Sequence, residues 1–116
     1  MKESSIMLLH YTTGILIALF GGVHLATHSF LGVTGYFDSL SYGSVTGRYN
    51  DSLLSIVLEL LLINVTYHGL NGFRIILIEV GNNYKWTRIV NWSTLSLGVI
   101  VIIYGTIIVL GKYFLI

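Results

Sequence analysis

Four histidines are the residues of this sequence whose type and placement indicate chemistry. All four lie within or at the ends of apolar stretches: His10, His24, His28 and His68. Ionisable side chains inside a membrane are costly and usually face a bundle interior, a water-filled cavity or a cofactor. A neutral imidazole is a good axial ligand for haem iron, and its second ring nitrogen then needs a hydrogen-bond acceptor. Zinc is a poor alternative, because no third and fourth ligand cluster at a suitable spacing.

The first apolar stretch carries three histidines and two glycines on one helical face. At about 100° per residue, that face holds His10, Gly14, Ile17, Gly21, His24 and His28. Small residues between histidines leave a groove, and either a neighbouring helix or a flat macrocycle would fill it.

The second stretch places His68 among small and polar residues. The predicted face holds Asn64, Val65, His68, Gly72 and Glu79, with Asn71 on its flank and Gly69 nearby. Asn64, Thr66 or a carbonyl one turn back is the expected partner of the second imidazole nitrogen. Arg74 follows about a turn and a half after His68, where its guanidinium would reach a haem propionate.

Simpler interpretations of these polar residues stay open. A single intramembrane histidine is often a hydrogen-bonded packing residue. A second interpretation of Arg74 is that its side chain only extends along the helix to place the guanidinium at the membrane interface. Glu59, on the side opposite His68, has two interpretations: a protonated, hydrogen-bonded carboxyl between helices, which is favoured, or part of a proton path.

The composition indicates a small, all-α membrane protein with one domain. The chain has 116 residues, of which 54% are hydrophobic and only 9% charged, far below the roughly 25% charged residues of a soluble domain. Three apolar segments, at about 6–31, 52–80 and 90–110, each suffice to cross a bilayer as a helix. The first is too long for a cleavable signal peptide. No basic patch suggests nucleic acid, and cysteine is absent, which excludes iron–sulfur ligands.

The connecting segments predict the orientation in a cell membrane, either an inner or a plasma membrane. Residues 32–51 form a long Gly/Ser/Tyr loop, whereas residues 81–89 form a tight turn. Positive charges favour the side that holds the N-terminus and this turn: Lys2, Arg74, Lys85 and Arg88, against Arg48 and Lys112. The N-terminus and the turn are therefore expected in the cytoplasm.

Residues 67–79, YHGLNGFRIILIE, resemble the second membrane helix of the cytochrome b anchors of succinate dehydrogenase and quinol:fumarate reductase. In that family a haem-ligating histidine is followed four positions later by glycine, then by an apolar residue, arginine and later an acidic residue. Here these residues are His68, Gly72, Phe73, Arg74 and Glu79. The resemblance covers residues 5–80, and the third segment matches only as a further span.

Residues 8–30, LLHYTTGILIALFGGVHLATHSF, resemble the first helix of the same anchors. His10 and Gly14 match its opening, and His24 with Leu25 matches the second histidine of the two-haem anchors, with one residue fewer between the histidines. The family binds quinone around the first histidine, which suggests a quinone site at His10 and Tyr11. Met7 and Tyr11, however, stand where mono-haem anchors carry serine and arginine.

The resemblance implies a haem-binding anchor without catalytic residues for succinate itself. A flavoprotein subunit would oxidise succinate, an iron–sulfur subunit would carry electrons to the membrane, and this chain would pass them to quinone. Single-chain two-haem anchors have five helices and four ligands, so a three-helix chain is expected to pair with a second small anchor and share two haems b. The expected iron ligands are His68 for the inner haem and His24 for the outer haem.

Several further assignments accompany this interpretation. Gly21 and Gly72 would clear room for porphyrin, and His28 would hydrogen-bond a propionate. Two rival interpretations are a haem-binding subunit of another respiratory enzyme, such as a hydrogenase or formate dehydrogenase, and a haem-free membrane anchor or assembly protein.

Overall fold

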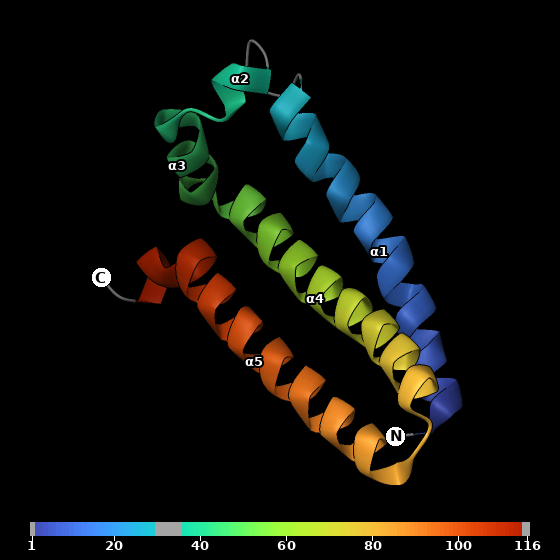
Figure 1. Ribbon diagram of the computed structural model, residues 1–116. Coiled ribbons are helices and arrows are strands. Elements are labelled where there is room, and N and C mark those ends of the chain that lie inside the picture. The colour runs from blue at the N-terminus through green and yellow to red at the C-terminus, as the bar shows by residue number, and fades with distance from the viewer. Residues whose placement is uncertain (1, 30–35, 115–116) are drawn as a thin grey trace.

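The computed structural model describes residues 2–29 and 36–114, and it is helical almost throughout these ranges. Of three long helices, the first two are connected through a region with two short helices, and a short turn connects the second to the third (Figure 1). The five elements are α1 (Glu3–Ser29), α2 (Tyr36–Ser39), α3 (Tyr42–Asn50), α4 (Ser52–Gly81) and α5 (Tyr84–Phe114). In length and composition, α1, α4 and α5 suffice to cross a membrane, as expected from the sequence.

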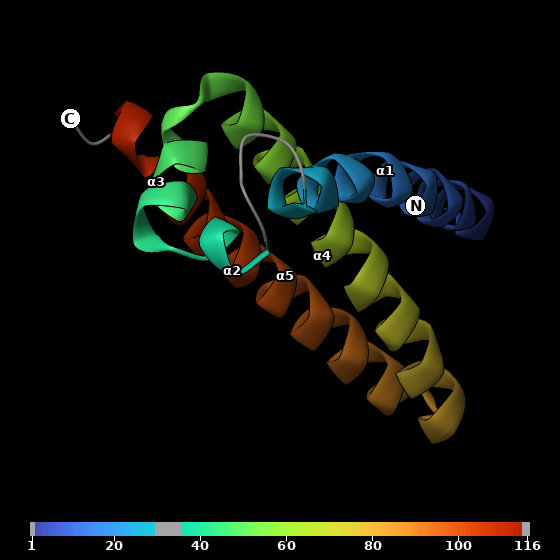
Figure 2. The same cartoon turned by 90° about the horizontal axis from the view of Figure 1, so that it is seen from above.

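The helix α4 is central, because it packs against both α1 and α5 (Figure 1). Seen from above, α1 and the α4–α5 pair diverge toward the N-terminus of α1 (Figure 2). The three long helices therefore form an open arrangement rather than a closed bundle, and large faces of α1 and α5 carry exposed apolar side chains.

Local signals fix the ends of α4 and α5. Asp51 caps the start of α4, its carboxylate accepting from the backbone N–H of Leu54 at 2.9 Å, and Asn82 ends it in the left-handed conformation with a φ of 43°. Asn83 then accepts from the N–H of Trp86 at 2.9 Å. The helix α5 therefore starts at Tyr84, six residues before the predicted start of the apolar run, and the predicted turn of 81–89 reduces to Asn82 and Asn83.

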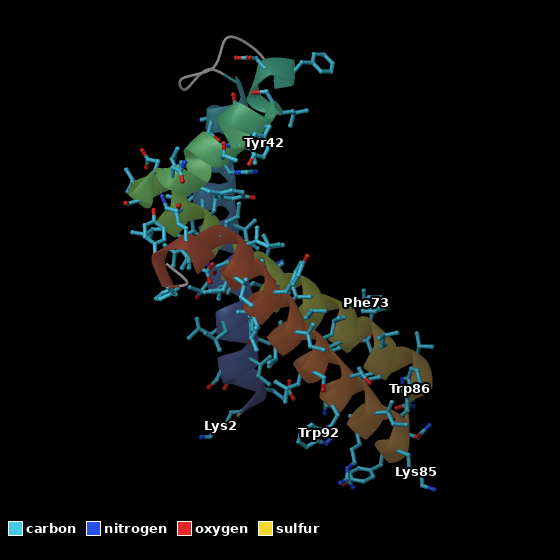
Figure 3. All side chains as sticks on the ribbon, turned by 90° about the vertical axis from the view of Figure 1, so that its left-hand side faces the viewer. Lys2, Tyr42, Phe73, Lys85, Trp86 and Trp92 are labelled. Atoms are coloured by element: carbon cyan, nitrogen blue, oxygen red, sulfur yellow. The ribbon has the colours of Figure 1, made fainter. Side chains whose placement is uncertain are left out.

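The described part of the predicted loop at 32–51 contains the short helices α2 and α3, which close one end of the molecule. The predicted end of the first apolar segment at 31 and the first four residues of this loop lie outside the described residues. Ser41 caps α3 by accepting from the N–H of Ser44 at 3.3 Å. Lys112, near the end of α5, donates to the side-chain oxygen of Asn50 at 3.0 Å. Figure 3 shows Tyr42 at this end, whereas Lys2, Lys85 and Trp92 lie toward the opposite end.

The interior is polar and the exterior apolar. Among the described residues, Val90 is the single large apolar side chain below one-tenth exposure. The buried polar residues, by contrast, are Thr27, Ser39, Ser55, Asn64, Thr66 and Asn71. Membrane helices gain little from burying apolar side chains, since lipid tails are equally apolar, and they pack instead through small and hydrogen-bonding residues. The described packing therefore suits a hydrocarbon environment.

Candidate functional site

His10 of α1 and His68 of α4 meet face to face where the two helices pack together. Their ring centroids are 4.0 Å apart and their planes differ by only 10°. Both side chains are half-buried. The sequence placed each histidine on a glycine-bearing face, and the structure brings these two faces together.

Each histidine lies against the glycine that follows the other one by four positions. A Cβ atom added to Gly14 would lie 3.1 Å from Cε1 of His68, and one added to Gly72 would lie 3.5 Å from Cε1 of His10. The repeated pattern of histidine, three residues and glycine is thus used reciprocally by α1 and α4. In this structure the space beside Gly72 receives the His10 ring.

The hydrogen bonds of His68 define which of its nitrogens carries the proton. Its Nδ1 lies 3.0 Å from the carbonyl oxygen of His10 and 3.3 Å from Oγ1 of Thr13. A carbonyl oxygen can only accept, so Nδ1 of His68 donates to it and the lone pair resides on Nε2. The acceptor that the sequence suggested at Asn64 or Thr66 is therefore the backbone carbonyl of His10, on α1. The side-chain amide of Asn64 instead donates to the carbonyl of Leu60 at 2.6 Å.

A chain of amide contacts runs from this pair to α5. Nδ2 of Asn71 lies 3.3 Å from Nδ1 of His10, and Oδ1 of Asn71 accepts from Nε of Arg74 at 3.2 Å. Nη1 of Arg74 donates to Oδ1 of Asn91 at 3.0 Å. Asn71 is buried, and it links the histidine pair on one side of α4 to Arg74 on the other. Binding of a haem propionate by Arg74 stays a prediction.

His24 and His28 form a second pair near the other end of α1, with ring centroids 4.7 Å apart and ring planes at 80°. Nδ1 of His28 lies 2.9 Å from Oγ of Ser39, whose carbonyl accepts from Nη2 of Arg48 at 2.6 Å. Among the described residues, neither ring nitrogen of His24 forms a hydrogen bond. The cavity beside His24 has a volume of about 10 Å³.

Gly21, one turn before His24, was expected to clear room for porphyrin. A Cβ atom there would lie 3.9 Å from Cδ1 of Leu61 on α4, an ordinary packing distance. Tyr11, of the expected quinone site, is exposed, and its ring lies edge-on to His10 at 6.3 Å. The structure thus brings His10 and Tyr11 together but leaves Tyr11 on the outer surface of α1.

Glu59 joins α4 to α5. Oγ1 of Thr106 donates to Oε1 of Glu59 at 2.6 Å, and Oε2 is buried without a hydrogen-bond partner in the described part of the chain. This geometry agrees with the hydrogen-bonded carboxyl between helices that the sequence suggested.

The described residues contain no group of three or more histidine, cysteine, aspartate or glutamate side chains arranged to hold a metal ion. A haem needs only axial ligands from protein, and one chain can supply one of them. Sequence reasoning did not identify the contributions of Thr13, Ser39, Arg48 and Asn91. The equal spacing of His10–Gly14 and His68–Gly72 was the one signal that pointed to pairing.

Comparison of the chain with protein-family models, curated proteins and solved structures gave no match. The resemblance to cytochrome b anchors therefore depends on the residues of the first two apolar segments alone.

Proposed function

We propose that this chain is a haem b-binding membrane anchor subunit of a succinate dehydrogenase or quinol:fumarate reductase. The observation that carries the proposal is the hydrogen bond from Nδ1 of His68 to the carbonyl of His10. It fixes the imidazole orientation and leaves the Nε2 lone pair for iron, as an outer-shell acceptor does for metal-bound histidine. The stacked His10 ring covers a face of His68, whereas an axial bond uses the ring edge.

The second ligand in this proposal is His24. Its match, together with Leu25, to the second histidine of the two-haem anchors supports this assignment. His24 lies 14 residues after His10 on one continuous helix, or about 21 Å along the axis. The two proposed ligands therefore belong to two haems at different depths. Because the cavity beside His24 is small and His10 packs against His68, the porphyrins would lie between this chain and a second membrane subunit.

Within such a complex, the residues of this chain bind and orient the cofactor. Bound b-type haem supplies one-electron transfer, here between an iron–sulfur subunit and quinone. The His10 carbonyl and Thr13 hold the proton on Nδ1 of His68, and the surrounding apolar helices exclude water. Docking of the soluble flavoprotein and iron–sulfur subunits is assigned to the α4–α5 turn.

Purification of the intact complex from native membranes tests this function. A reduced-minus-oxidised spectrum should contain b-type haem bands, and a flavoprotein and an iron–sulfur protein should co-purify. Haem with hydrogenase or formate dehydrogenase subunits instead would assign the chain to another respiratory enzyme.

A haem-free anchor is the second candidate, and one observation favours it. His10 and His68 each fill the space beside a glycine of the other helix, which is a sufficient packing role for both. A complex that contains no haem bands would support this function.

The orientation with the N-terminus and the α4–α5 turn in the cytoplasm belongs to the same proposal. Accessibility tags at Gly43, in α3, and at Asn83, in the turn, should report opposite sides, with Asn83 cytoplasmic. Cytoplasmic labelling of Gly43 alone would invert the orientation.

A further inference from the structure

A cleft lies between α4 and α5, and Ile6 of α1 also lines it. Asn71 separates it from the histidine pair, because Asn71 lines the cleft and contacts His10. The volume of the cleft is about 430 Å³, and its walls are apolar along most of their length, with Leu70, Gly98 and Ile102 among the lining residues. Exposed Leu95 and Val99 also line it, so the cleft reaches the surface of the helix pair. Figure 1 shows α4 and α5 side by side over this length.

The polar end of the cleft carries a positive charge. Arg74, Asn71 and Asn91 line this end, and both hydrogen bonds of the guanidinium go to neutral amide oxygens, at 3.2 and 3.0 Å. Among the described residues no carboxylate contacts Arg74. A cation in apolar surroundings is costly without a counter-charge, so this end of the cleft favours an anion.

The depth of Arg74 places that anion at the membrane interface. Arg74 lies seven residues before the end of α4, and Asn91 lies seven residues after the start of α5. The 30 residues of α4 span about 45 Å, against a hydrocarbon thickness of about 30 Å. If α4 is centred, Arg74 lies about 3 Å inside the hydrocarbon boundary, within reach of the headgroup region.

We propose that this cleft binds an anionic phospholipid, with its phosphate on Arg74 and one acyl chain between α4 and α5. A guanidinium matches phosphate oxygens with two parallel donors. From Arg74 toward the middle of both helices the lining of the cleft becomes apolar. The acyl chain of the bound phospholipid would contact this apolar part of the cleft. This assignment is independent of haem binding, and it gives Arg74 a partner other than the propionate expected from the sequence.

The test uses the purified, delipidated complex and measures retained lipid by native mass spectrometry. Three probes are compared: phosphatidylglycerol, phosphatidylcholine and inorganic phosphate. We expect phosphatidylglycerol to bind at least about tenfold more tightly than phosphatidylcholine, and inorganic phosphate alone not to compete. Arg74→Gln should weaken phosphatidylglycerol binding about tenfold or more, since it removes the charge-assisted hydrogen bonds to the phosphate.

Matched variants separate the effect of the charge inside the cleft from the effect of any positive charge at the same end of the molecule. Arg88→Gln removes an exposed arginine at the same end, outside the cleft, and should leave binding unchanged. Asn91→Asp should pair with Arg74 and weaken binding, whereas Asn83→Asp, in the exposed turn, should not. The comparison of Asn91→Asp with Asn83→Asp still tests the proposal if the Arg74→Gln variant fails to insert into the membrane.

Three outcomes would overturn the proposal: equal binding of both lipids, competition by inorganic phosphate alone, or a quinone recovered in the cleft in place of phospholipid. If Arg74→Gln lowers haem content and leaves lipid binding intact, the guanidinium serves a propionate instead.

Discussion

The two histidine pairs differ in what holds them. His10 and His68 come from two helices, stack in parallel, and are positioned by a backbone carbonyl and by reciprocal glycines. His24 and His28 come from one helix, meet edge to face, and contact a connection between helices through Ser39. The first pair depends on the register of α1 against α4, whereas the second depends on how α2 and α3 close one end.

This difference separates the consequences of mutation at the two ends. A change at the first pair acts on the packing of α1 against α4. A change at the second pair should alter the surroundings of His24 and His28 while leaving the contact between α1 and α4 intact. Mutations at the two ends should therefore have separable effects.

The largest effect is expected from His68→Ala, which should remove the inner haem and leave the helices inserted. If two haems are shared, the purified complex should lose about half of its haem per polypeptide, because each iron needs both axial ligands. His10→Ala is the matched control, since it removes the stacked ring but keeps the carbonyl that accepts from His68. Unchanged haem content in His68→Ala would exclude this histidine as a ligand.

The corresponding test at the second pair compares His24→Ala with His28→Ala by low-temperature electron paramagnetic resonance. His24→Ala should abolish one low-spin haem signal. His28→Ala should only shift its potential, because the resemblance to two-haem anchors assigns the iron to His24 and leaves His28 to hydrogen-bond a propionate. The reverse result would make His28 the ligand, and survival of both signals would leave His68 as the one ligand from this chain.

Gly14→Val should destabilise the packing of α1 on α4 by about 1–3 kcal/mol, the usual range for overpacking a close contact. The reason is the 3.1 Å approach that even a Cβ atom would make to His68. Gly22→Val is the matched control on the same helix, because a Cβ there meets nothing within 4 Å. Detergent-induced unfolding in mixed micelles measures both, and equal effects would show that the reciprocal packing does not stabilise the chain.

The sequence was sufficient to predict the three long helices. Apolar length and helical periodicity are local properties, so they carry over directly to α1, α4 and α5. The predicted start of α4 at residue 52 agrees with the structure, where Asp51 caps it. The start of α5 was predicted late because its first turns are polar and its cap, Asn83, is a single side chain.

Contacts between distant segments were beyond the sequence. His10 and His68 are 58 positions apart, and their stacking depends on how α1 is aligned along α4. Periodicity within each helix does not define this alignment. The same holds for Arg74, whose contact with Asn91 depends on how α5 folds back after a two-residue turn. Helices α2 and α3 were missed because their Gly/Ser/Tyr composition has weak helical propensity.

The smallest effect is expected from Arg48→Ala, which removes the donor to the Ser39 carbonyl at 2.6 Å. A hydrogen bond from a charged group contributes about 1.5–3 kcal/mol to stability at most. Solvent at this part-buried site lowers that contribution, so its loss should have a small effect. Hydrogen exchange should therefore rise in α2 and α3 and around His28. Exchange should stay unchanged around His10 and His68, because Arg48 forms no hydrogen bond with either histidine or with their partners Thr13 and Asn71 in the described part of the chain.

Arg88→Ala, at the opposite end of the molecule, controls for loss of an exposed positive charge and should leave exchange in α2 and α3 unchanged. Faster exchange around His10 in Arg48→Ala would mean that the two ends are coupled through α1. In that case the closure of one end would help to set the register of α1 on α4, and the separation between the two pairs would fail. Exchange confined to α2, α3 and His28 would instead leave reciprocal packing alone as the source of that register.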